Sequence, residues 1–314
     1  MKMSAKKVLG LVLAGVLAAG SLTACGGGGT AATTADTKAE ATTAAGDAKA
    51  ESDAAADTTA ADSGEKKTLR VAMECAYAPY NWTQPDDSNG AVAIADSNEF
   101  AYGYDVMMAK KICEELGYDL EIVRLDWDSL IPAVTTGKVD CVIAGQSITS
   151  ERLQAVDFTE PYYYATIVTL VKNGSKYADA KSVADLAGAT CTSQQSTIWY
   201  DTCLPQIQDA NILAATASAP DMLMSLNADK CDLVVTDQPT GKGALVAYPD
   251  FKLLEFGGGE DDFQVTDEDI NIGISLKKGN TELKEAIDSV LSKMTKDDFS
   301  AMMDEAISVQ PLAN

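Results

Sequence analysis

Polar groups that could hold a small charged molecule follow several short apolar runs of this sequence. The segment 145–152 supplies main-chain N–H groups from Gly145 onward, the hydroxyl of Ser147 and the guanidinium of Arg152. N–H groups at a helix start attract anions, and arginine holds a carboxylate with two parallel hydrogen bonds. The segment therefore favours an anion site, although a capped helix with a surface arginine would leave the same pattern.

Acidic, aromatic and hydroxyl side chains lie at comparable positions elsewhere in the chain. They are Glu74, Tyr77, Trp127, Ser196, Thr197 and Asp237. A free amino acid presents a carboxylate, an ammonium and a variable side chain, so its site needs anion donors, an acid and side walls. All three kinds of group are present here. The alternatives are core packing for the two aromatic residues and a surface or capping role for the two acids.

The composition excludes several classes of function. The chain contains no histidine, which removes the Ser-His-Asp and Cys-His arrangements of nucleophilic catalysis and the usual zinc sites. A formal net charge of −23 argues against a nucleic-acid ligand. The cysteines after Cys25 show no CxxC spacing and favour small buried thiols, with a disulfide as the alternative. We expect no enzymatic activity, no metal and no cofactor.

Strand and helix patterns alternate around these candidate residues. In the first half, the patterns predict strands over 68–73, 120–125 and 141–144 and helices over 103–116 and 129–135. In the second half, they predict strands over 190–193, 212–215 and 231–236 and helices over 197–207 and 221–227. Gly117 and Gly137 follow the first two helices at the usual terminating position. The alternation predicts an α/β fold with parallel-type sheets covered by helices.

The two halves share a short repeat. The segment 137–144, Gly-Lys-Val-Asp-Cys-Val-Ile-Ala, is similar to 229–236, Asp-Lys-Cys-Asp-Leu-Val-Val-Thr, and each follows a predicted short helix. Two similar lobes are one interpretation, and chance similarity of helix-turn-strand units is the other. Because ligands bind beyond the carboxyl ends of strands in open α/β sheets, two facing lobes would form a cleft lined by the candidate residues.

The N-terminus has the layout of an export signal. Lys2, Lys6 and Lys7 precede an apolar stretch over 8–19 that is too short to span a membrane, which indicates a signal peptide over 1–24. The sequence Leu-Thr-Ala-Cys ending at Cys25 resembles a lipobox, in which the cysteine is acylated. An ordinary signal peptide with a chance cysteine is the alternative. The rest of 25–67 has almost no bulky apolar residue, which predicts a disordered tether.

Seven motifs resemble the polar amino-acid binding proteins of ABC importers, which are extracellular solute-binding proteins of family 3. They are Ala76-Tyr-Ala-Pro-Tyr80, Gly103-Tyr-Asp-Val106, Asp126-Trp-Asp-Ser-Leu-Ile-Pro-Ala133, Gly137-Lys-Val-Asp140, Ala144-Gly-Gln-Ser-Ile-Thr-Ser-Glu-Arg152, Val156-Asp-Phe-Thr-Glu-Pro-Tyr162 and Asp185-Leu-Ala-Gly188. The resemblance covers nearly all of 68–312. It implies a type II periplasmic-binding-protein-like fold, with lobe 1 over 68–165 plus 271–314, lobe 2 over 166–270, and two hinge strands near 162–166 and 268–273.

The resemblance also implies roles for the candidate residues. It assigns the ligand carboxylate to Arg152, Ser147 and the backbone of Gly145, and the ammonium to Asp237. The aromatic walls would be Tyr77 and Trp127, and Glu74 would contact the ligand side chain. Two departures affect specificity, because Gln195-Ser196-Thr197 replaces the family's usual Gly-Thr-Thr type turn and the stretch 84–100 lengthens the first loop.

The expected protein is a monomeric substrate-binding lipoprotein at the extracellular face of the plasma membrane. It would close its lobes on a free amino acid, polar or cationic in its side chain, and deliver it to permease and ATPase subunits. The alternatives are an amino-acid sensor without transport partners and a dehydratase-like enzyme on the same fold.

Overall fold

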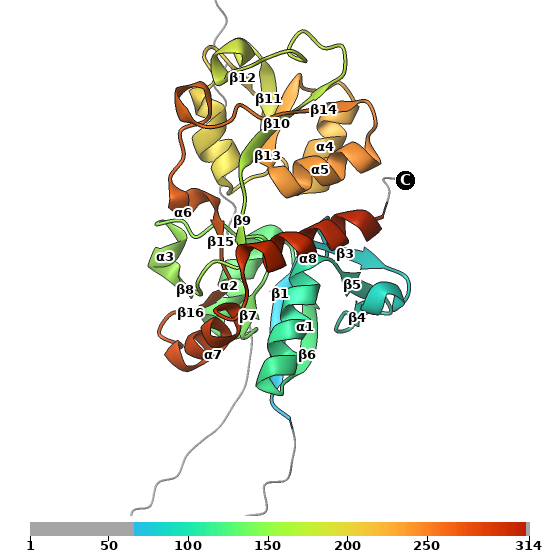
Figure 1. Cartoon of the computed structure of the whole chain (residues 1–314), viewed down its shortest axis with the longest axis vertical. Coiled ribbons are helices and arrows are strands. Elements are labelled where there is room, and N and C mark those ends of the chain that lie inside the picture. Colours follow the sequence, from blue (N-terminus) through green and yellow to red (C-terminus); the bar gives the residue numbers. More distant parts are fainter. Residues whose placement is uncertain (1–65, 312–314) are drawn as a thin grey trace, which may run out of the picture. The chain divides into compact units, whose positions relative to one another are not determined.

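Two β-sheets lie at the centres of two lobes in the part of the chain that the computed structural model describes, residues 66–311 (Figure 1). The expected signal peptide, Cys25 and nearly all of the expected tether lie outside the described residues.

The sheet of lobe 1 has the strand order β6-β1-β7-β16-β8. Its strands are β1 (Thr68–Met73), β6 (Asp119–Arg124), β7 (Cys141–Val142), β8 (Val156–Phe158) and β16 (Ser275–Lys277). Strand β1 pairs in parallel with β6 and β7, whereas β16 runs antiparallel to β7 and β8. A small antiparallel sheet adjoins it, with β2 (Ala76–Tyr77), β3 (Asn81–Gln84), β4 (Val92–Ala93) and β5 (Phe100–Tyr102) in the order β2-β3-β5-β4.

The sheet of lobe 2 repeats this organisation with the order β12-β11-β13-β10-β14. Its strands are β10 (Ile167–Lys172), β11 (Thr190–Thr192), β12 (Asn211–Ile212), β13 (Leu233–Asp237) and β14 (Phe251–Leu254). Strand β11 is parallel to β12 and β13, and β10 is antiparallel to β13 and β14.

The expectation of parallel-type sheets is therefore only partly correct. Strands β9 (Tyr163–Tyr164) and β15 (Asn271–Ile272) pair antiparallel and join the lobes, within the predicted hinge segments (Figure 1). Strands β10 and β16 each follow a hinge strand directly. They enter their sheets from the edge where the parallel strands end, so they must run in the opposite direction.

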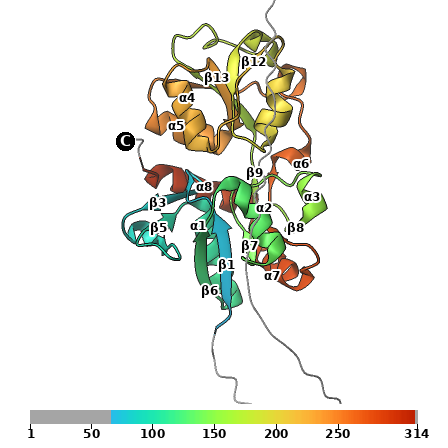
Figure 2. The same cartoon turned by 180° about the vertical axis from the view of Figure 1, so that it is seen from behind.

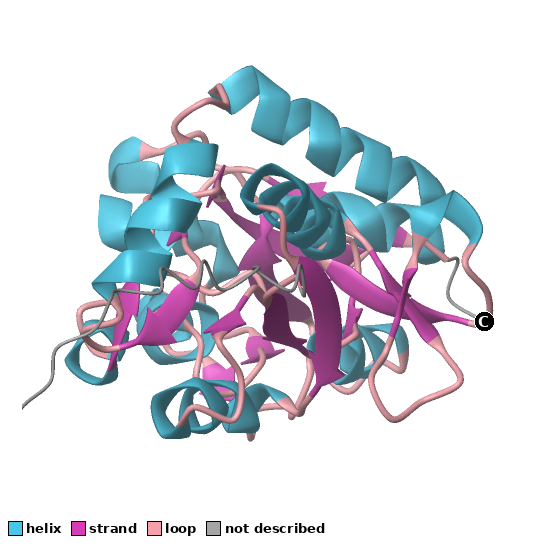
Figure 3. Cartoon of the chain, turned by 90° about the horizontal axis from the view of Figure 1, so that it is seen from below, coloured by secondary structure: helices cyan, strands magenta, loops and turns pink. Residues whose placement is uncertain are grey.

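The helices lie around the sheets, as Figures 2 and 3 show from other sides. Lobe 1 carries α1 (Tyr104–Leu116), α2 (Trp127–Thr136), α3 (Arg152–Ala155), α7 (Thr281–Leu291) and α8 (Lys296–Val309). Lobe 2 carries α4 (Ala219–Asn227) and α5 (Gln238–Ala247), and α6 (Asp267–Ile270) precedes the hinge strand β15. Gly117 and Gly137 end α1 and α2 in the left-handed conformation, as their positions predict.

The segment predicted as a helix over 197–207 is helical, but it is not a regular α-helix. The segment forms a π-helical turn, Trp199–Cys203, followed by a 3₁₀ turn, Leu204–Gln206. Pro205 has no N–H, so the α-helical hydrogen bond to the Asp201 carbonyl cannot form.

Apolar side chains from both faces of the sheets form the core. Among the described residues, all six cysteines are buried free thiols, in agreement with the expectation drawn from their apolar contexts. Burial raises the pKa of the Cys75 thiol to about 12, so this group is neutral and unreactive at physiological pH.

Candidate functional site

Most of the predicted site residues meet where the two lobes touch. A cavity of about 10 Å³ is lined by Tyr77, Trp127, Gly145, Ser147 and Arg152 of lobe 1 and by Gln194, Thr197, Ile198 and Trp199 of lobe 2. A space of about this size accommodates a single water molecule. The lobes are therefore closed on each other, and a larger ligand can enter only if they separate.

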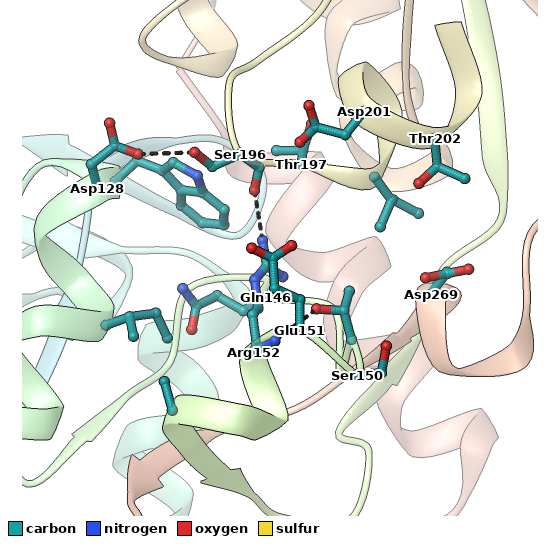
Figure 4. A pocket seen from close by; sticks show the side chains of 15 residues that line it. Asp128, Gln146, Ser150, Glu151, Arg152, Ser196, Thr197, Asp201, Thr202 and Asp269 are labelled. Carbon is teal, nitrogen blue, oxygen red and sulfur yellow. Dashed lines mark hydrogen bonds between the residues drawn. The ribbon is translucent and has the colours of Figure 1, made fainter. Parts of the chain in front are cut away.

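Arg152 connects the lobes from the first residue of α3. Its Nη1 donates to the carbonyl oxygen of Ser147 at 2.8 Å, and its Nη2 donates to the carbonyl oxygen of Ser196 at 2.9 Å (Figure 4). The guanidinium carbon lies 5.3 Å from the centre of the Trp127 ring, within cation–π range. Burial lowers the pKa of Arg152 to about 10, so the side chain remains cationic at neutral pH.

Asp237 ends β13 and caps the N-terminus of α5. Its Oδ1 accepts from the Thr240 N–H at 2.8 Å, and its Oδ2 accepts from the Tyr77 hydroxyl of the opposite lobe at 2.8 Å. The Asp237 side chain is buried, and burial raises the pKa of its carboxyl. The predicted cation-binding acid and the predicted aromatic wall are thus bonded to each other across the cleft.

Gln194 lines the small cavity, and Glu74 is buried near Gln194 without lining the cavity itself; each leaves one polar atom unpaired. Glu74 is 7% exposed and Gln194 is 1% exposed. Within the described residues, the Glu74 Oε2 and Gln194 Nε2 atoms have no hydrogen-bond partner. Burial raises the pKa of Glu74 to about 8. Since an unpaired buried polar atom costs about 1–3 kcal/mol, both atoms would gain from a polar ligand group.

A buried polar network supports the loop that contains Gly145. The Gly145 N–H donates to the Tyr162 hydroxyl at 3.0 Å, and that hydroxyl donates to Asp105 at 2.6 Å. Asn81 donates to the same carboxylate at 2.7 Å and accepts from the Cys75 N–H at 2.7 Å. The network joins the loops after β1 and β7. The Gly145 N–H predicted to hold a carboxylate is occupied by Tyr162 in this closed state.

The side-chain hydroxyls of Ser196 and Thr197, which were predicted to contact the ligand, bond to protein groups in this closed state. Thr197 Oγ1 donates to the Gln194 carbonyl at 2.7 Å, and Ser196 Oγ donates to Asp128 at 3.3 Å. Ser147 contributes its carbonyl oxygen to Arg152. The Gln195 amide belongs to the turn that departs from the family's pattern, and its Nε2 donates to Asp128 at 2.5 Å.

Sequence reasoning missed four residues at this contact. They are Asp128, Gln194, Ile198 and Trp199. Gln194 was within a segment predicted to follow a strand, and Asp128 is the second acid of the Asp126-Trp-Asp motif, so signals for both were present. Nothing in the sequence singled out Ile198 or Trp199.

A wider cavity of about 490 Å³ opens beside Arg152 (Figure 4). Four acids, Asp128, Glu151, Asp201 and Asp269, line it together with Arg152 and Trp127. Because four carboxylates and one guanidinium line this wider cavity, it carries an excess of negative charge. No three His, Cys, Asp or Glu side chains among residues 66–311 form a group that could hold a metal ion. No helix within that range is long and apolar enough to cross a membrane.

Comparisons with known proteins agree with this architecture. The L-arginine-binding protein of Pseudomonas aeruginosa is 28% identical over 221 residues, covering 69% of this chain and 78% of that protein. An amino acid ABC transporter substrate-binding protein from Streptococcus pneumoniae, solved bound to L-arginine, is 27% identical with a TM-score of 0.66, covering 78% and 95% of the two chains.

A third similar structure is an ancestral amino-acid-binding protein described as a precursor of cyclohexadienyl dehydratase. It is 28% identical with a TM-score of 0.61 and covers 76% of this chain and 95% of its own. The family model of the bacterial extracellular solute-binding proteins, family 3, matches residues 69–306. The two-lobed fold, the hinge strands and this match together show that the chain belongs to the bacterial extracellular solute-binding proteins, family 3.

Proposed function

We propose that this protein binds a free L-amino acid between its lobes and delivers it to an ABC importer. The observation that carries the proposal is one small site between the lobes that the cationic Arg152 lines together with Tyr77, whose hydroxyl bonds the buried carboxyl of Asp237 in the opposite lobe. These groups suit the carboxylate and the ammonium of an amino acid. The ligands named for the arginine-binding relatives support the same class.

Binding would replace contacts that the closed protein now makes with itself. The ammonium would take the place of the Tyr77 hydroxyl on Asp237, and the carboxylate would accept hydrogen bonds from Arg152. Because the ligand would contact both lobes at once, it would favour the closed state by its differential contacts. The permease would then recognise the closed form.

The ligand side chain we favour is polar or cationic. Glu74 and Gln194 offer it an acid and an amide whose buried atoms are unpaired. An aliphatic side chain would leave them unpaired. A cationic side chain would ionise the Glu74 carboxyl and pair with it, which an acidic side chain cannot do. Tyr77 and Trp127 would pack against the methylene or amide portions of the ligand.

Titration calorimetry with L-arginine, L-glutamine and L-glutamate at neutral pH tests this function. We expect L-arginine or L-glutamine to bind most tightly and L-glutamate to bind most weakly. Tightest binding of L-glutamate would show that Glu74 does not select against acidic side chains. No binding of any common L-amino acid or of cystine would reject the proposed ligand class.

Attachment to the outer face of the membrane is a further part of the proposal. The short apolar stretch before Leu-Thr-Ala-Cys25 supports export and acylation. Two acyl chains on the cysteine would anchor a monomer stably, and the permease and ATPase would be separate chains.

We propose no catalytic step. The dehydratase alternative is favoured only by the similarity to the ancestral precursor protein and by Glu74 as a potential proton donor. Incubation with prephenate-like acids and analysis of the products would reveal such an activity.

A further inference from the structure

We propose that Asp128 and the turn Gln195–Ser196 form a latch that holds the closed state and sets how long the ligand stays bound. Asp128 lies in the first turn of α2 in lobe 1, and the turn belongs to lobe 2. Asp128 Oδ2 accepts from Gln195 Nε2 at 2.5 Å. Asp128 Oδ1 accepts from Ser196 Oγ at 3.3 Å, and Figure 4 shows this second bond.

The backbone of the turn presents both donors to lobe 1. Ser196 has a φ of +55°, in the left-handed region that few residues other than glycine adopt. Its carbonyl oxygen accepts from Arg152 while its hydroxyl donates to Asp128. The turn therefore makes three hydrogen bonds with lobe 1, accepting one and donating two, and all of them cross between the lobes.

The residues of the latch do not line the small cavity in which we place the ligand. Neither Asp128 nor Gln195 lines the 10 Å³ cavity that Arg152, Tyr77 and Trp127 enclose. Asp128 instead lines the wider mouth beside it. Asp128 is also exposed, so its two bonds hold neither lobe's core together. These bonds can form only when the lobes meet, and they must break before the ligand leaves.

A contact formed only after closure slows release more than it affects capture. Hydrogen bonds to a charged acceptor are among the stronger ones, and solvent exposure weakens them. We therefore expect loss of the latch to speed dissociation by roughly 3- to 30-fold. The ratio of affinities between two ligands should stay unchanged, because the latch does not contact the ligand.

Stopped-flow tryptophan fluorescence with L-arginine and L-glutamine tests the proposal in the ligand-bound protein, an arm that rests on the proposed function. The variants are Asp128→Ala, Gln195→Ala and the double variant. Asp126→Ala is the matched control, because it removes the same charge two residues away, where no side-chain cap hydrogen bond exists. We expect faster dissociation in both single variants, no further increase in the double variant, association within about twofold, and an unchanged control.

A second arm needs no ligand. Single-molecule energy transfer between labels at Glu114 in α1 and Met224 in α4 reports the closed fraction of the ligand-free protein, and Asp128→Ala should lower it. If neither amino acid binds the unmodified protein, the proposed ligand class fails and this arm alone decides the latch. Additive effects in the double variant, an equal effect of Asp126→Ala, or unchanged dissociation and closed fraction in Asp128→Ala would each overturn the latch.

Discussion

Arg152 brings a positive charge into the contact between the lobes and bonds main-chain oxygens on both sides of it. We predict that Arg152→Ala weakens amino-acid binding by roughly thirtyfold or more, because it leaves a carboxylate without its charged partner. The fold should survive, since the side chain is not part of the apolar core. Arg152→Lys keeps the charge but lacks the planar guanidinium, so its ligand affinity should lie between that of the unmodified protein and that of Arg152→Ala. Calorimetry showing less than threefold weakening in Arg152→Ala would contradict this role.

A second prediction at the scale of single residues is that ligand affinity depends on pH through the carboxyl of Glu74. Burial raises the pKa of Glu74 to about 8, so the free protein carries a mostly protonated carboxyl at pH 7. A cationic side chain beside it would lower that pKa, so binding would release a proton. The affinity for L-arginine should then rise with pH up to about pH 8, by at most about tenfold per unit.

The matched variant for this prediction is Glu74→Gln, which keeps the shape and removes the titration. Its affinity for L-arginine should change less with pH between 6 and 8 than the affinity of the unmodified protein. The affinity of the unmodified protein for L-glutamine should change less with pH than its affinity for L-arginine. Identical pH slopes in the unmodified protein and Glu74→Gln would assign the proton to another group.

At the scale of elements, the loop after β7 passes very close to the loop after β1. Gly145 has a φ of +63°, and a Cβ added there would lie 2.8 Å from Cε1 of Tyr77. We predict that Gly145→Ala destabilises the protein by about 2–4 kcal/mol, combining left-handed strain with overpacking. It should also weaken ligand binding, because Tyr77 must move.

Gly137→Ala is the control for this substitution, because Gly137 has a φ of +76° and nothing lies within 4 Å of an added Cβ. It should cost only about 1–2 kcal/mol, the strain alone. Urea unfolding followed by titration measures both effects. Equal losses of stability in the two variants would show that the contact with Tyr77 is not tight.

At the scale of the whole molecule, the proposal joins a two-lobed receptor to a membrane anchor. We predict that Cys25→Ser releases the protein into the culture medium, since the serine hydroxyl cannot take the place of the acylated thiol. Fractionation and immunoblotting compare it with the unmodified chain, and Ser21→Ala serves as the neighbouring control. A Cys25→Ser protein that stays processed and membrane-bound would require another anchor.

The amino-acid sequence by itself determined the local architecture. Apolar runs and terminating glycines predicted α1, α2 and most of the strands, because helix and strand periodicities are local properties. The ends of those strands pointed to Arg152, Asp237 and Tyr77, since the carboxyl ends of parallel strands share one edge of a sheet, whereas Trp127 came from the family resemblance. Seven ordered motifs also pointed to the correct family.

Tertiary structure decided how these groups are paired. The Tyr77 hydroxyl reaches Asp237, and Asp128 reaches Gln195, only because the hinge brings separate lobes into contact. The antiparallel direction of β10 and β16 likewise follows from where the chain re-enters each sheet. Such partners are distant in sequence and depend on the lobe arrangement, which no local pattern encodes.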